Sequence, residues 1–213
     1  APRLSFNQSG VVVENLAQGV ARHGALVEPQ LGRHAWFQAN AFAALNTAFL
    51  HDGALVIVPR SAGVCAPLHL LFVATQPDVA SYPRCLLVAD AGTTATIVED
   101  HVALTDGAYF TNAVCEIVLA ANASLTHVRV QRDSAAAFHI AHCAVALAHA
   151  SRYQSASVSF GARISRYNLD VLQTAEGAEC VIDGLALITD RQLADTHTCI
   201  DHAKPHGVSR QLH

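Results

Sequence analysis

Histidine and cysteine are the residues of this sequence whose chemistry first suggests a site. The chain has 13 histidines and 6 cysteines among 213 residues. One cluster is His139-Ile140-Ala141-His142-Cys143. On a β-strand, His139 and Cys143 would share one face and His142 would lie on the other. A closed metal site needs three or four convergent ligands, so further ligands would have to come from neighbouring strands. We therefore interpret this cluster as a packed strand.

A second cluster runs from His197 to His202. His197, Cys199 and Asp201 would alternate onto one face of a strand, and His202 follows directly. Imidazole, thiolate and carboxylate groups are ligands for iron or zinc. Sequence neighbours rarely supply all the ligands of a metal, so we favour an outward polar row that hydrogen-bonds to adjacent strands. These four residues are weak metal candidates, and we assign no metal ligand.

Catalytic signatures are missing from the sequence. It has no phosphate-binding G-x-x-x-x-G-K-S/T, no G-x-G-x-x-G, no G-x-S-x-G and no H-E-x-x-H. The carboxylate pair Glu99-Asp100 would point to opposite faces of a strand, and we interpret it as a solvated strand end. We therefore expect a protein that is not an enzyme, with no catalytic residue and no cofactor-binding residue.

The composition indicates a heavily packed interior. Hydrophobic residues make up 52% and charged residues 14% of the chain, and the formal net charge is −4. These values argue against disorder, and the lack of a basic run argues against nucleic acid or anionic membranes as partners. No apolar run reaches the roughly 18 residues of a membrane helix. We expect a cytoplasmic protein whose cysteines are reduced and buried, acting as small hydrophobic side chains.

Two kinds of element can be placed from the pattern. A helix is predicted near residues 36–51, where Phe37, Ala41, Ala44, Leu45, Ala48 and Phe49 form one apolar stripe. After Gly53, short β-type runs recur about every 14 residues. They begin near residues 54, 67, 83, 95, 109, 123, 137, 151, 165, 178, 191 and 207. We divide the chain into an N-terminal segment, 1–52, and a β core, 53–213.

Several of these runs alternate between polar and apolar residues. In one of them, Val128 and Val130 oppose His127, Arg129 and Gln131. Alternation indicates one buried face, and we expect the aliphatic face to be the interior. Two-residue hairpin turns of the Asn-Gly type are rare here, which favours an all-β parallel solenoid over a sandwich.

The chain also reads as an excised piece. It has no methionine, and it stops in Ser209-Arg210-Gln211-Leu212-His213 without a terminating signal. We expect a β core that is truncated at both ends. Because unpaired strand edges invite pairing, we expect this fragment to self-associate or to need protection of its last coil, 207–213.

Several stretches together resemble the SufB/SufD family of the SUF iron–sulfur cluster assembly machinery. They are ALNTAFLHDG at 44–53, VIVP at 56–59, PLHL at 67–70, YFTNAV at 109–114, AFHI at 137–140, SRYNL at 165–169, GAEC at 177–180, DTHT at 195–198 and SRQ at 209–211. The helix end with its His51-Asp52-Gly53 exit is similar to the SufD branch more than to the SufB branch. The resemblance covers nearly the whole chain.

The resemblance implies a right-handed parallel β-helix that serves as a scaffold subunit. In that family, SufD-type subunits pair with SufB through their β-helices, and both engage the ATPase SufC through C-terminal helices. The resemblance further implies that the cluster is held transiently by the intact complex and that this fragment binds no cofactor. The Cys-x-His pair tied to the cluster site in the family has no counterpart here, since Cys199-Ile200-Asp201 differs from it.

Three other interpretations stay open. A polysaccharide-acting β-helix enzyme would need a groove lined with carboxylates and aromatic residues, and the sequence has one tryptophan, Trp36. A structural or partner-binding solenoid without a metal role would share the same strand pattern. A SufB-type cluster scaffold is disfavoured by the details of the helix exit.

Overall fold

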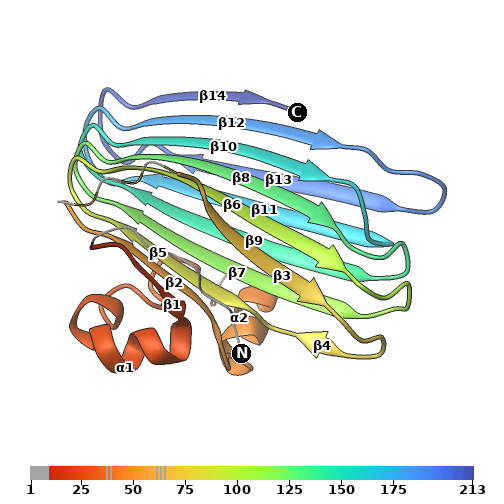
Figure 1. Ribbon diagram of the computed structural model, residues 1–213. Helices are drawn as coiled ribbons and strands as arrows, with labels where there is room; N and C mark the ends of the chain where they lie inside the picture. Colours follow the sequence, from red (N-terminus) through yellow and green to blue (C-terminus); the bar gives the residue numbers. More distant parts are fainter. Residues whose placement is uncertain (1–9, 37, 39, 61, 63, 65) are drawn as a thin grey trace.

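The computed structural model describes residues 10–213 except residues 37, 39, 61, 63 and 65. The chain winds into a parallel β-solenoid of about five turns, which confirms the predicted fold class. Two sheets face each other across the interior, and successive coils stack from the N-terminal end to the C-terminal end (Figure 1).

Each coil contributes one strand to each sheet. In spatial order, sheet A contains β1 (Val12–Asn15), β2 (Gly53–Val58), β5 (Arg84–Ala89), β7 (Phe110–Leu119), β9 (Phe138–Leu147), β11 (Ile164–Gln173) and β13 (Leu193–Asp201), with β4 (Ala80–Ser81) beside β7. Sheet B contains β14 (Val208–Leu212), β12 (Glu179–Ala186), β10 (Arg152–Ser159), β8 (Ser124–Arg132), β6 (Thr94–Ala103) and β3 (Leu68–Ala74). The β1–β2 pair is antiparallel, and every other pair between the described strands is parallel.

The strands lie where the sequence pattern predicts them. Each predicted run after Gly53 begins within two residues of an observed strand, from β2 to β14. The two-residue strand β4 was not predicted, because it is too short to show a pattern. The regular spacing therefore corresponds to half of a coil, because successive runs lie in alternate sheets.

One corner of the coil repeats a backbone conformation. Five residues have positive φ at this corner, and each lies two residues before the start of a strand of sheet B. They are Gly92, Asn122, Ala150, Gly177 and His206, with φ values of 71°, 59°, 50°, 70° and 62°. The left-handed conformation turns the chain sharply, and glycine and asparagine adopt it with least strain. This corner sets the repeat of the solenoid.

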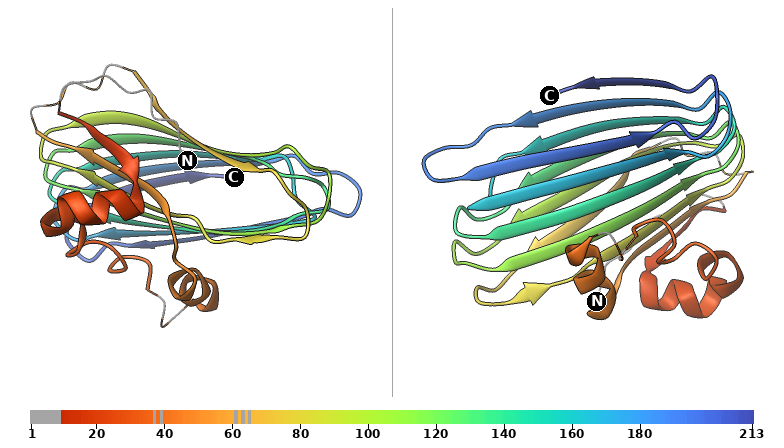
Figure 2. Two further views of the ribbon diagram at one scale, coloured as in Figure 1. Left: turned by 60° about the horizontal axis from the view of Figure 1, so that its bottom comes forward. Right: turned by 180° about the vertical axis from the view of Figure 1, so that it is seen from behind.

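Two helices cover the outer face of sheet A at its N-terminal end (Figure 2). Helix α2 (Ala41–Ala48) lies within the predicted span 36–51 but is shorter, and Phe37 of the predicted stripe lies outside the described residues. Asn40 caps α2 by accepting hydrogen bonds from the backbone N–H groups of Phe42 and Ala43, and so it defines the helix start.

Helix α1 (Leu16–Val27) was not predicted, so the expectation of a single N-terminal helix is wrong. Its apolar periodicity is weakened by Gly19, His23 and Gly24, and His23 has non-helical angles. Gly19 is required by packing, because a Cβ there would lie 2.2 Å from Leu55 Cδ2. None of the described helices is long and apolar enough to cross a membrane.

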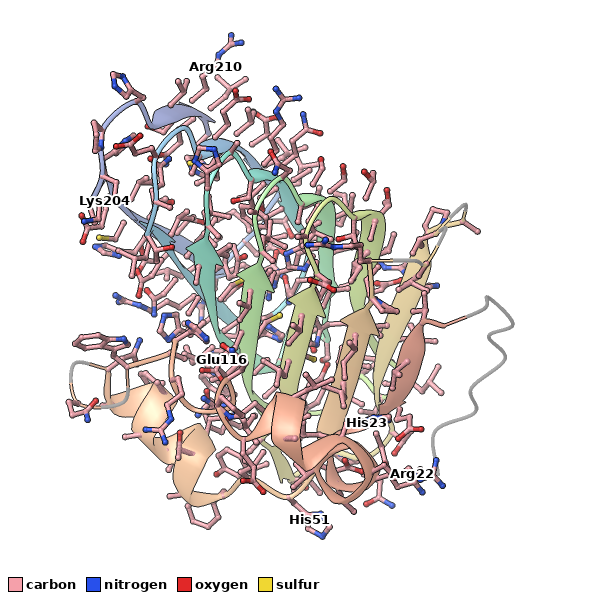
Figure 3. All side chains as sticks on the ribbon, turned by 90° about the vertical axis from the view of Figure 1, so that its left-hand side faces the viewer. Arg22, His23, His51, Glu116, Lys204 and Arg210 are labelled. Atoms are coloured by element: carbon pink, nitrogen blue, oxygen red, sulfur yellow. The ribbon has the colours of Figure 1, made fainter. Side chains whose placement is uncertain are left out.

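A buried ion pair fastens the N-terminal segment to sheet A. Glu116 on β7 accepts hydrogen bonds from Nε and Nη2 of Arg84 at 3.0 and 2.9 Å. The same carboxylate accepts from the backbone N–H groups of Gly32, His34 and Ala35 at 2.8, 2.8 and 3.1 Å. Glu116 thus lies between sheet A and the loop that precedes α2 (Figure 3). Burial would raise the pKa of Glu116, but Arg84 and these amides lower it.

Candidate functional site

The interior of the solenoid is apolar in one half and polar in the other. Inward side chains of β6 change from Ala95 and Ile97 to Glu99 and His101 as the strand runs on. On β8, buried Leu125 is followed by three buried polar side chains. The polar half therefore lies toward the C-terminal ends of the sheet B strands, at their arrowheads in Figure 1.

The buried face of β8 is the reverse of the predicted one. His127, Arg129 and Gln131 have exposed fractions of 1%, 1% and 0%, whereas Val128 and Val130 on the opposite face are half-buried. The predicted alternation is confirmed, but the expectation that the aliphatic face is the interior is wrong for this strand. Polar side chains are tolerated inside because partners on neighbouring coils satisfy them.

Glu99 is the centre of the buried network. Its carboxylate oxygens lie 2.7 Å from His101 Nε2 and 3.2 Å from His127 Nε2. Arg129 Nε lies 3.8 Å away. Burial alone would raise the pKa of Glu99, but the hydrogen bonds from the two histidines hold it well below its usual value. Glu99 is therefore a buried anion.

Asp133 forms a second anionic centre. Tyr109 Oη donates to Asp133 at 2.6 Å and Gln131 Nε2 donates at 2.7 Å. His139 Nδ1 lies 2.9 Å from the same carboxylate, and His139 Nε2 lies 2.6 Å from Arg129 Nη2. Burial lowers the pKa of His139 to about 4 despite Asp133. A neutral His139 that accepts from Arg129 at Nε2 fits the second contact, whereas Nδ1 lies close to Asp133 without a hydrogen bond of good geometry.

His127 links this network to a row of thiols. Its Nδ1 lies 3.0 Å from the hydroxyl of Tyr153, which lies 4.0 Å from Cys143 Sγ. Burial would lower the pKa of His127, but hydrogen bonds with Cys143 and Glu99 raise it to about 10. Hydrogen bonding with Cys115 lowers the pKa of Cys143 to about 5. Burial would raise this pKa, but hydrogen bonding with His127 also lowers it. The shifts thus favour the protonated form of His127 and the thiolate form of Cys143.

A cavity of about 560 Å³ reaches the polar half from the N-terminal coils. His101, Tyr109, Thr111 and Asp133 contribute to its lining, and the ring of Phe72 stacks on His101 with 4.8 Å between centroids. The network can hold charge and relay protons away from bulk water, and its opening admits small polar molecules.

The predicted clusters occupy two environments. His139 and Cys143 share the interior face and His142 lies on the outer face, as predicted, where its Nε2 is 2.8 Å from Asp170 Oδ2. Four cysteines are buried, whereas Cys199 is exposed, so the burial prediction is wrong for Cys199. Cys65 lies outside the described residues.

The weak metal candidates lie on the surface. His197, Cys199, Asp201 and His202 are exposed, and His202 Nε2 lies 3.0 Å from Ser209 Oγ. Within the described ranges, no three His, Cys, Asp or Glu side chains are placed to hold one metal ion. The four candidates stay a prediction without structural support.

The interpretation of Glu99-Asp100 as a solvated strand end is wrong. Glu99 is 5% exposed and Asp100 is 6% exposed, on opposite faces of β6. Asp100 is covered on the outer face by Arg132, whose Nη2 lies 2.6 Å from Asp100 Oδ2. The strand register could have identified Glu99 as a buried residue, because its cross-strand partner on β8 is the oppositely charged Arg129.

Two family models together match almost the whole chain. The model described as "SUF system FeS cluster assembly, SufBD core domain" matches residues 72–213. The chain belongs to the SufBD family of iron–sulfur cluster assembly proteins. The family's model of the SufBD protein N-terminal region matches residues 3–70, which contain the helical segment.

Curated relatives agree with this membership. An iron–sulfur cluster assembly SufBD family protein of Synechocystis is 38% identical over 182 residues, covering 81% of this chain and 40% of the relative. The iron–sulfur cluster assembly protein SufD of Escherichia coli is 30% identical over 181 residues, covering 83% and 43%. The chain therefore spans about two fifths of the length of these relatives. Their similarity supports a role of this family member in iron–sulfur cluster assembly.

Proposed function

We propose that this chain is a SufD-type scaffold subunit of the SUF system and that it is not an enzyme. The observation that carries the proposal is the match of the SufBD core model to residues 72–213, which include the solenoid from late β3 onward. The 30% identity to a SufD protein favours the SufD branch. We further propose that it acts in the cytoplasm.

The proposed partners are a SufB-like β-helix subunit and a SufC-like ATPase. The support for the SufB-like partner is the fold: in this family the subunits pair through their β-helices, and β2 to β14 form a parallel β-solenoid. In the family the SufC-like ATPase is engaged through C-terminal helices, whereas the matches of this chain are to the SufBD core and N-terminal models. We therefore expect this chain to retain the ATPase only through the SufB-like subunit.

Co-purification tests this proposal. The tagged chain is co-expressed with a SufB-like subunit, with a SufC-like ATPase, or with both, and the eluates are measured by size-exclusion chromatography with light scattering. We expect a stoichiometric complex with the SufB-like subunit, and retention of the ATPase only when that subunit is present. A chain that remains alone in all three mixtures would support a partner-free structural solenoid instead.

The proposed cofactor behaviour has its own test. We propose that the isolated chain holds no cluster and that the cluster resides transiently on the complex. Anaerobic addition of iron and sulfide to the chain alone should give no cluster-type visible absorbance. A stable cluster on the isolated chain would favour a SufB-type cluster scaffold.

A further inference from the structure

The cavity of about 560 Å³ at the N-terminal coils, here called the N-terminal cavity, has the size of a small-molecule site. Its wall is built by β3, β4, β6 and β7 and by the segment between α2 and β2. Elements that are distant in the sequence therefore meet around one space. The chemistry of the side chains in this wall decides which kind of ligand fits.

The permanently charged side chains that line the N-terminal cavity are acidic. Asp52 and Asp133 contribute carboxylates, and no lysine or arginine is among the described residues of the lining. Asp133 is 8% exposed. Burial would raise its pKa, but His139, Tyr109 and Gln131 lower it well below its usual value, so Asp133 is an anion. The lining therefore repels anionic ligands and attracts cations.

His101 adds a hydrogen-bond acceptor to the lining. It is 3% exposed, and its Nε2 lies 2.7 Å from Glu99 Oε1. Because the Glu99 carboxylate can only accept, Nε2 carries the proton of this contact. In the neutral ring, Nδ1 then has a lone pair, and no hydrogen bond between described residues uses it. His101 can therefore accept from a ligand that donates.

Four aromatic residues also line the N-terminal cavity: Phe49, Phe72, Tyr82 and Tyr109. The rings of Phe49 and Tyr82 stack with 4.9 Å between their centroids, and the ring of Phe72 stacks on His101. Aromatic faces attract organic cations, and their apolar surface can pack against the hydrocarbon part of such a ligand. The lining thus combines acidic groups with aromatic surface.

Metal ions do not fit this lining, because within the described ranges no three His, Cys, Asp or Glu side chains are placed to hold one metal ion. An ammonium group needs no such coordination, since each of its N–H groups can donate to a separate acceptor. We propose that the N-terminal cavity binds a small organic ammonium ion, with its charged end at Asp133 and its apolar part against the aromatic residues. This site is independent of the proposed SUF function.

Three ligands of equal chain length test the proposal. n-Butylammonium, n-butanol and butyrate are titrated into the chain at about pH 7, where an alkylamine is protonated, and amide chemical shifts are followed by NMR. We expect n-butylammonium to bind at least about 10-fold more tightly than n-butanol, because it adds charge-assisted hydrogen bonds. We expect butyrate not to bind. Equal affinity for all three ligands, tighter binding of n-butanol or butyrate, or no binding of n-butylammonium would overturn the proposal.

The carboxylates of the lining are tested by amide substitutions. Asp133→Asn should weaken n-butylammonium binding at least about 10-fold. Asp52→Asn should weaken it about threefold, because solvent screens the charge of a half-buried side chain. Asp90→Asn is the matched control, since Asp90, like Asp52, accepts from the backbone N–H group of the next residue but does not line the cavity. Unchanged binding in Asp133→Asn, or an equal loss in Asp90→Asn, contradicts the assignment.

The location of the shift changes decides the question if Asp133→Asn does not fold. In the parent chain, n-butylammonium should move the amide signals of Tyr82, His101 and Thr111, which line the cavity, and leave those of β13 in place. Changes that are absent from these three residues and present on β13 would place the ligand elsewhere and would refute the site.

Discussion

Glu99 holds three basic side chains in the interior because its two oxygens are shared among them. His101 and His127 lie within hydrogen-bond distance, and Arg129 lies 3.8 Å away. For buried groups, an unpaired charge costs far more than a pair contributes, so each of these basic side chains depends on the carboxylate. Replacing one of these residues should therefore destabilise the fold mainly because its partners stay buried without a counter-charge.

Glu99→Gln should destabilise the fold by about 3 kcal/mol, because the isosteric amide leaves buried basic groups without their counter-ion. Urea unfolding measures the change. Glu179→Gln is the matched control, since Glu179 pairs with Arg152 at an exposed position and should change stability by less than about 1 kcal/mol. Equal losses in both variants would show that the Glu99 network contributes no more than a surface pair.

His127 should make stability depend on alkaline pH. Its pKa is raised to about 10 in the folded state, whereas an unfolded histidine titrates near about 6.5. The favourable contribution is then complete below the unfolded value and is lost as the pH rises through the folded value. The unfolding free energy of the parent should fall across this window, and His127→Gln should show a shallower slope. Parallel pH profiles for both proteins would contradict the raised pKa.

At the scale of the element, the repeating corner is the feature that turns strands into coils. Its left-handed residue is glycine in two coils and asparagine in a third, but alanine at Ala150. Alanine in this conformation is strained by roughly 1 kcal/mol relative to glycine. Ala150 and His206 are thus the two of these five corner residues that are neither glycine nor asparagine.

Ala150→Gly should stabilise the protein by about 0.5 to 1 kcal/mol, since the relief of strain exceeds the entropy gained by the unfolded chain. Thermal unfolding measures the shift. Ala148→Gly is the control, because Ala148 lies two residues earlier and is not among the described residues with positive φ. It should destabilise. A destabilised Ala150→Gly variant would contradict the role of the corner.

The Glu116 clamp should act on the N-terminal segment more than on the solenoid. Glu116→Gln removes the charge that faces Arg84 and weakens the acceptor of three amides. Hydrogen exchange should accelerate at Gly32, His34 and Ala35, while the amides of β9 and β11 keep their protection. Uniform loss of protection along the chain would show that the segment and the solenoid unfold as one unit.

At the scale of the whole molecule, the coil repeat could be predicted from sequence and the interior could not. Strand positions follow from spacing, and the shared face of His139 and Cys143 follows from strand alternation. The partners of His139 come from elsewhere: Arg129 lies on sheet B and Asp133 lies in the loop before β9. One strand's pattern gives two faces but does not say which is buried, because polar side chains become acceptable inside once other coils satisfy them.

Self-association of the chain stays a prediction. Leu185, Leu187 and Ile188 are exposed at the end of β12. Exposed apolar side chains that lie close together favour association with another chain. Size-exclusion chromatography with light scattering measures this association, and a stable monomer at high concentration would contradict the prediction.

Cluster formation by the reconstituted assembly tests the central claim most directly. The chain, a SufB-like subunit and a SufC-like ATPase are mixed anaerobically with iron and sulfide, and visible charge-transfer absorbance is followed with and without the chain. The scaffold account predicts that cluster accumulates in the complete mixture and much less when the chain is omitted. The same yield in both mixtures would contradict it.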